Sequence, residues 1–134
     1  MALADRLACL HAGIASVVRQ HEPTEAAVEA PFHGVSARSA LQLAHARGVV
    51  LAALGSSGMR VFEYSPATIK KAVTGNGRAE KGQVEVMVSR LVTGDHRSGK
   101  SDIADAIAAA LCHLFGTGRT DALSKVVGAV RLRP

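Results

Sequence analysis

Apolar residues recur along most of the chain at the spacing of an amphipathic helix, and two short runs break that rhythm. The first stretch repeats them every three or four positions and stops before Pro23: Leu3, Leu7, Leu10, Ile14, Val17 and Val18. This spacing predicts a helix with one apolar face. The next apolar run, residues 26–30, is too short for a helix between Pro23 and Pro31, so we predict a buried strand there.

The same reasoning predicts one more strand and four more helices. A helix opens at Ser36 or Ser39, runs through Leu51 and is closed by Gly55. The sequence RVFEY, residues 60–64, is the second strand, and Ser65-Pro66 then begins a short helix. Residues 74–78 form a loop, residues 84–91 a helix, 93–100 a flexible connection and 100–113 the last helix. The apolar face expected for that last helix is Ile103, Ala106, Ile107, Ala110, Leu111 and Leu114.

Strands separated by helices indicate an α/β protein with a parallel sheet, which must be covered on both faces. We expect two parallel strands flanked by about five helices. Two strands are too few for an independently stable parallel sheet, because sheets average roughly five or six strands. The pattern therefore predicts further strands upstream of the first helix.

Composition narrows the class of protein. The chain is 48% hydrophobic but only 3% aromatic, and 16 Lys and Arg against 11 Asp and Glu give a net charge of +5. This excess of positive charge favours a polyanionic partner. We expect Cys9 and Cys112 to be reduced core residues. A cytoplasmic protein is expected, because no apolar run approaches ~18 residues and the first residues do not resemble a secretion signal.

Three carboxylates stand where carboxylates are unusual. Glu29 interrupts the first strand near its end, and Asp102 and Asp105 lie three residues apart at the start of the last helix. Glu29 could point into solvent, and acids in a first turn complement the helix dipole. The alternative is that all three bind a divalent metal, because gathered carboxylates repel one another and need a hard cation such as Mg²⁺.

Three blocks of sequence favour the second interpretation: VEAPFHGVSARSALQLAHARGVVLAAL, VFEYSPATIKKAVTGNGRAEKGQVEVMV and SDIADAIAAALCH. In order and approximate spacing they resemble the RuvC family of Holliday junction resolvases, from about residue 3 to residue 115. The resemblance implies a ribonuclease H-like fold and a dimeric, Mg²⁺-dependent endonuclease that nicks four-way DNA junctions in recombination and repair. It also implies two Mg²⁺ ions per site, a homodimer and possible association with a junction-migration helicase complex.

Individual positions are carried over from the family pattern. The resemblance implies that Glu29, Asp102 and Asp105 are catalytic residues and metal ligands, and that Phe32 stacks near the junction centre. It implies DNA contacts for Lys70 and Lys81, which belong to a group of basic side chains that cluster around the glycine loop, and we expect the whole group to bind DNA. This group, which we call the basic group, comprises Lys70, Lys71, Arg78 and Lys81. The competing interpretation of the basic group is an ordinary solvated surface.

One departure from the family is large, because its first acid lies in an Asp-Pro-Gly-like motif on an N-terminal strand, and no such motif occurs here. We expect residues 1–116 to be an N-terminally truncated ribonuclease H-like nuclease domain and residues 117–134 a loosely ordered basic tail. The truncated chain should cut DNA more slowly than one with three further strands. Two alternatives remain: a catalytically inactive protein that binds branched DNA, and a remnant that only dimerises, through the helix from Ser39 to Leu54.

Overall fold

The computed structural model describes residues 1–30, 36–93, 101–117 and 131–132. The chain forms two compact units, Met1–Glu63 and Tyr64–Pro134, and each is described by itself. The connection predicted for residues 93–100 lies outside the described residues except for Thr93.

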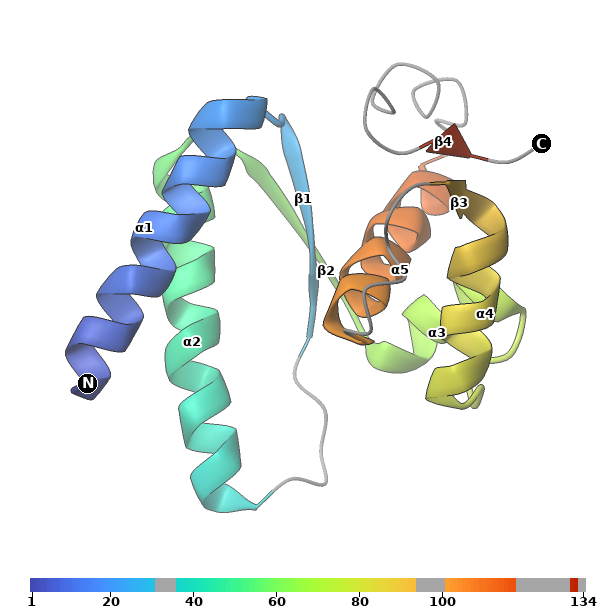
Figure 1. The fold of residues 1–134 in the computed structure, drawn as a ribbon, viewed down its shortest axis with the longest axis horizontal. Coiled ribbons are helices and arrows are strands. Elements are labelled where there is room, and N and C mark those ends of the chain that lie inside the picture. Colours follow the sequence, from blue (N-terminus) through green and yellow to red (C-terminus); the bar gives the residue numbers. More distant parts are fainter. Residues whose placement is uncertain (31–35, 94–100, 118–130, 133–134) are drawn as a thin grey trace. The chain divides into compact units, whose positions relative to one another are not determined.

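The first unit alternates helices and strands in the predicted order. Helix α1 (Leu3–His21) leads to strand β1 (Glu25–Glu29), and helix α2 (Ala37–Ser56) leads to strand β2 (Arg60–Tyr64). The two strands pair and run parallel, and α1 and α2 lie side by side (Figure 1). The first unit therefore has the expected α/β arrangement.

Helix α1 presents its apolar stripe to its neighbour, but it buries no residue fully. Its half-buried positions include Leu7, Leu10, Ile14 and Val18. The buried core of the first unit consists of Ala53, Leu54 and Met59. Cys9 is exposed, so its prediction as a core residue was wrong: it lies off the stripe that faces α2.

The ends of α2 test the capping predictions. Ser36 is the N-cap, and its hydroxyl accepts a hydrogen bond from the Ser39 amide at 3.3 Å. The predicted stop at Gly55 was too early, because the helix continues to Ser56. Gly58, two residues beyond the helix, has a left-handed backbone at φ 72°, where a side chain would be strained.

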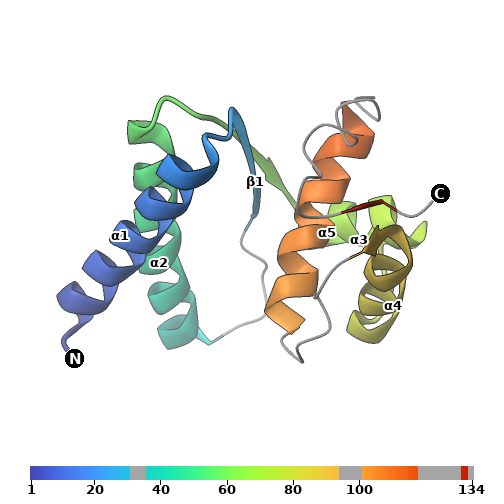
Figure 2. The same ribbon diagram turned by 45° about the horizontal axis from the view of Figure 1, so that its top comes forward.

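The second unit is built from three helices packed together. Helices α3 (Pro66–Thr74), α4 (Lys81–Leu91) and α5 (Ser101–Gly116) contact one another (Figure 2). Ser65 caps α3 as predicted, accepting from the Thr68 amide at 3.1 Å. The core of the unit is made of small and branched side chains: Ile69, Val73, Ala79, Val84, Val88, Val92, Ala104, Ala108, Ala109, Leu111 and Cys112.

The buried face of α5 differs from the predicted one. Ala104 and Ala108 are buried, whereas Ala106 and Ala110, which were expected in the core, are exposed. The helix is apolar on nearly every side, so periodicity alone could not select the face. Alanines on the inner face let α3 and α4 approach closely, which fixes the choice through packing.

Two short strands were not predicted. Strand β3 (Val92–Thr93) pairs antiparallel with strand β4 (Arg131–Leu132), with Val92 opposite Leu132 and Thr93 opposite Arg131. Apart from Thr117 and β4, the predicted basic tail of residues 117–134 lies outside the described residues, so its looseness stays a prediction. Within the described ranges, no helix is long and apolar enough to cross a membrane.

Candidate active site

Asp102 and Asp105 lie at the start of α5 on one face of the helix, because residues three apart in a helix are neighbours. Both residues are exposed. Oδ2 of Asp105 lies 3.2 Å from Nζ of Lys81, the first residue of α4. The structure therefore joins one of the predicted acids to one of the predicted DNA-contacting bases.

This ion pair has a clear electrostatic signature. The hydrogen bond that Lys81 donates to Asp105 raises the pKa of Lys81 above its ordinary value, and the charges of Asp105, Asp102 and Glu85 raise it further. Partial desolvation acts in the opposite direction. Because the Lys81 side chain is 56% exposed, water and salt screen the pair, and its main effect is on local charge rather than stability.

The loop before Lys81 is held by its own polar groups. Gly75 adopts the left-handed conformation at φ 81° and ends α3, with its amide donating to the Lys71 carbonyl at 2.9 Å. Asn76 Oδ1 accepts from the Arg78 amide at 3.0 Å. A Cβ on Gly77 would come within 3.2 Å of the Ala67 carbonyl oxygen, so the loop lies close against the start of α3.

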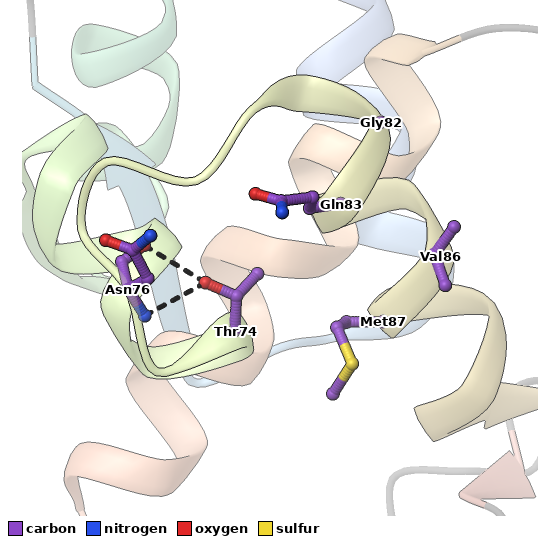
Figure 3. A pocket seen from close by; sticks show the side chains of 6 residues that line it. All are labelled: Thr74, Asn76, Gly82, Gln83, Val86 and Met87. Carbon is purple, nitrogen blue, oxygen red and sulfur yellow. Dashed lines mark hydrogen bonds between the residues drawn. The ribbon is translucent and has the colours of Figure 1, made fainter.

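A pocket of about 400 Å³ opens beside this loop and the first turns of α4 (Figure 3). Its lining residues are Thr74, Asn76, Gly82, Gln83, Val86 and Met87. Two polar members are already engaged: Thr74 Oγ1 bonds the Asn76 backbone, and Gln83 Oε1 accepts from the Glu80 amide at 3.0 Å. These bonds fix the loop that carries Arg78 and leads into Lys81.

The basic group lies on the second unit. Lys70 and Lys71 are in the second half of α3, Arg78 is in the loop, and Lys81 begins α4. Lys71, Arg78 and Lys81 are exposed and Lys70 is half-buried. Of these, Lys81 forms the ion pair with Asp105. Phe32 lies outside the described residues.

Glu29 is the last residue of β1 and is exposed. Its backbone carbonyl accepts a hydrogen bond from Nη1 of Arg47 in α2 at 2.6 Å. The other guanidinium nitrogen, Nη2, lies 2.7 Å from Oε1 of Glu63 in β2. One arginine thus contacts the ends of both paired strands.

The donor atoms of the three predicted acids suit a hard divalent cation, which prefers carboxylate oxygens. Among the described residues, however, no three His, Cys, Asp or Glu side chains form a cluster that could hold a metal ion. Because the two units are described separately, the approach of Glu29 to the Asp102–Asp105 pair stays a prediction.

Two arrangements near these residues were not predicted from the sequence. The first is the pair of contacts made by Arg47. Its position in the sequence could have suggested a specific partner, because it is a charged residue within the apolar stretch of α2. In the second unit, the Tyr64 hydroxyl lies 2.6 Å from Nδ1 of His113, a residue of α5 that is 5% exposed. This bond joins Tyr64, the first residue of the second unit, to the helix that carries the two aspartates.

Comparison with known proteins identifies the family. The family model for "Crossover junction endodeoxyribonuclease RuvC" matches residues 1–113. The protein of that name from Koribacter versatilis is 45% identical over 112 residues, covering 84% of this chain and 68% of the relative. The one from Zymomonas mobilis is 49% identical over 113 residues, covering 84% and 67%. The chain thus spans about two thirds of the length of these relatives.

Solved structures agree with the sequence comparison. The structure of Thermus thermophilus RuvC in complex with Holliday junction substrate matches with a TM-score of 0.78 and 28% identity, covering 99% of this chain and 76% of that one. A second structure of Thermus thermophilus RuvC matches with a TM-score of 0.76 and 29% identity, covering 99% of this chain and 75% of that one. The sequence-based prediction of a ribonuclease H-like α/β fold is therefore confirmed. The chain belongs to the RuvC family of crossover junction endodeoxyribonucleases.

Proposed function

We propose that the protein is a Holliday junction resolvase, an endonuclease that nicks four-way DNA junctions during recombination and repair. Membership of the RuvC family and the likeness to a relative bound to junction DNA support this proposal. The observation that carries it to particular residues is the contact between Lys81 and Asp105. Lysine commonly binds phosphate, and carboxylates commonly bind Mg²⁺. The contact therefore brings a side chain suited to the DNA backbone next to one suited to the metal.

The proposed catalytic residues and metal ligands are Glu29, Asp102 and Asp105. They would hold Mg²⁺, with two ions in a site that has its full set of acids. When bound, the ions would supply activation of the attacking water and stabilisation of charge on the leaving 3′ oxygen. The exposure of all three residues supports this role, because carboxylates at the surface can reach both metal and DNA.

The basic group is proposed to contact the DNA backbone. Lys70, Lys71, Arg78 and Lys81 line the second half of α3, the glycine loop and the start of α4. Each positive charge placed near a phosphate releases counterions, so binding should weaken steeply as salt rises. Phe32 is proposed to stack on a base near the junction centre, where aromatic rings can replace lost base stacking.

A homodimer is the proposed working state, with α2 at the interface. On this helix, Leu41 is 59% exposed and Leu43 is 58% exposed. The two leucines lie on different sides of the helix, because residues two apart do not share a face, and the proposed interface is the side that carries Leu41. The protein is proposed to act in the cytoplasm, with a junction-migration helicase complex as a further partner.

We expect the chain to nick DNA more slowly than a version with three further strands and the family's first acid. Three carboxylates give two cations fewer shared ligands, and misplacement of a reacting group by about 1 Å can lower a rate on the order of 100-fold. Single-turnover nicking by the two forms measures the difference. Equal rates would show that another acid already completes the site.

The experiment that tests the proposed function compares binding to a synthetic four-way junction with binding to a linear duplex of the same sequence. A resolvase should prefer the junction, and its affinity should fall with salt. Mg²⁺-dependent nicking then separates a resolvase from an inactive junction-binding protein. Affinity that is absent, or that does not depend on salt, would favour a protein that only dimerises.

A further inference from the structure

Arg47 makes two contacts through different nitrogens of one guanidinium group. Nη1 donates to the Glu29 carbonyl at 2.6 Å, and Nη2 lies 2.7 Å from Oε1 of Glu63. Its side chain is 18% exposed, against 48% for Glu63, so the guanidinium is largely enclosed while its acidic partner reaches solvent. All three residues belong to the first compact unit.

These contacts act at the point where the sheet ends. Glu29 is the last residue of β1, and Glu63 is the residue before the last in β2. The ladder stops where the strand ends, and there the Glu29 carbonyl accepts a hydrogen bond from Arg47, which holds the backbone at this point. A planar guanidinium fixes that carbonyl and the neighbouring strand together, which the single ammonium of a lysine cannot do with the same geometry.

The contact uses the backbone of Glu29 and leaves its side chain available. Within the described parts of the chain, the Glu29 carboxylate has no hydrogen bond or ion pair, although its main chain is held. Glu63 balances the positive charge of Arg47. The paired guanidinium would therefore repel a nearby metal cation less than an arginine without an acidic partner. The arrangement suits a carboxylate that must keep its oxygens free for a metal.

We propose that Arg47 is a positioning residue, which orients Glu29 for metal binding by holding its backbone carbonyl, with Glu63 as the counter-charge. The proposal rests on the proposed function, because it takes Glu29 to be a metal ligand. Arg47 itself touches neither metal nor DNA in this role. Groups that orient metal ligands from outside the ligand set typically change metal affinity by about 10- to 100-fold when they are removed.

The test measures Mn²⁺ binding to the protein without DNA, by electron paramagnetic resonance, in the unaltered chain and four variants. Arg47→Gln removes the clamp, and Arg47→Lys keeps its charge but not its fork. Glu63→Gln is the matched control that removes the ion pair and leaves the bond to the Glu29 carbonyl. Glu29→Gln is the reference for loss of the carboxylate itself, and circular dichroism with thermal unfolding shows which variants fold.

Both Arg47 variants should weaken Mn²⁺ binding by about 10-fold or more. Glu63→Gln should weaken it by less than about threefold, as expected for a partly exposed ion pair. In junction nicking, the Mg²⁺ concentration that gives half the maximal rate should rise in the same order. If Arg47→Gln does not fold, the Mn²⁺ affinity of Arg47→Lys is compared with that of the unaltered chain instead. This variant keeps the charge and most of the side-chain volume.

Two results would overturn the inference alone: unchanged Mn²⁺ affinity in the folded Arg47 variants, or a loss in Glu63→Gln as large as in Arg47→Gln. A purely structural role would lower the unfolding temperature and leave metal affinity unchanged. A different result would remove the proposed metal site together with the inference, namely an unaltered chain whose Mn²⁺ binding is absent or insensitive to Glu29→Gln.

Discussion

Nζ of Lys81 at the start of α4 lies 3.2 Å from Oδ2 of Asp105 in α5, so a predicted DNA-contacting base and a predicted metal ligand share a contact. The pair is on the surface, with 56% of the lysine side chain and 45% of the aspartate side chain exposed. A lysine in this position can pair with Asp105 when DNA is absent and with a DNA phosphate when DNA is bound.

Lys81→Ala should weaken binding to a four-way junction without changing the fold. Loss of one phosphate contact should lower the slope of log affinity against log salt by about one. Fluorescence anisotropy at several salt concentrations measures both affinity and slope. Arg90→Ala is the matched control, because Arg90 is an exposed base at the other end of the same helix. An equal loss in both variants would assign the effect to overall charge.

The same Lys81→Ala variant should bind divalent metal as well as, or up to several-fold better than, the unaltered protein. The ammonium group competes with a cation for the Asp105 carboxylate, and exposed charges of this kind interact weakly. Titration with Mn²⁺ in the absence of DNA measures this affinity. Weaker metal binding in the variant would mean that Lys81 orients Asp105 rather than competing for it.

The two cysteines should differ in reactivity. Burial raises the pKa of the Cys112 thiol, which also lies 3.9 Å from the Thr68 carbonyl oxygen, whereas Cys9 is exposed. At mildly alkaline pH, a thiol reagent should therefore modify Cys9 quickly and Cys112 only when the second unit opens. Mass spectrometry after timed labelling tells the two sites apart. Equal labelling rates in the folded protein would contradict the burial of Cys112.

The raised pKa of Cys112 also predicts the direction of an alkaline effect on stability. An unfolded chain loses the thiol proton at a lower pH than the folded chain. The contribution of Cys112 to stability is therefore fully present below the unfolded pKa and is lost as pH rises through the folded pKa. Denaturant unfolding of the protein and of Cys112→Ala across this range should show a smaller alkaline loss in the variant.

Leu41→Lys should shift the protein from dimer to monomer if α2 forms the proposed interface. A charge placed at the exposed position 41 must be desolvated when two copies meet across that side of α2, which opposes association. Sedimentation velocity at several concentrations measures the oligomeric state. Val86→Lys is the control, because Val86 is a 49% exposed apolar residue on α4. Dimers that persist in Leu41→Lys would exclude this face.

Local patterns predicted much of the fold because they depend on neighbouring residues. Helical spacing and the caps Ser36 and Ser65 located α2 and α3, and the two short apolar runs located β1 and β2. The two-residue strands β3 and β4 were missed because residues about 40 apart form them, and strands this short have no periodicity of their own.

Side-chain relationships between distant elements were the least predictable. The sequence indicated Lys81 and Asp105 separately, but their contact depends on how α4 packs against α5. The contact between Arg47 and the Glu29 carbonyl involves a backbone atom. Every residue has such an atom, so the residue type at position 29 could not predict the contact. The error at Cys9 has the same origin, since a cysteine in an apolar helix can lie on either face.

The most direct test of the proposed function is single-turnover nicking of a synthetic four-way junction, with each strand labelled in turn. Asp102→Asn and Asp105→Asn are compared with the unaltered protein, and a linear duplex of the same sequence is the control substrate. We predict Mg²⁺-dependent nicks at symmetric positions in two strands of the junction, at least about 100-fold slower in either variant because each removes a charged metal ligand. Nicking that survives both replacements, or that is equally fast on the duplex, would contradict the proposal.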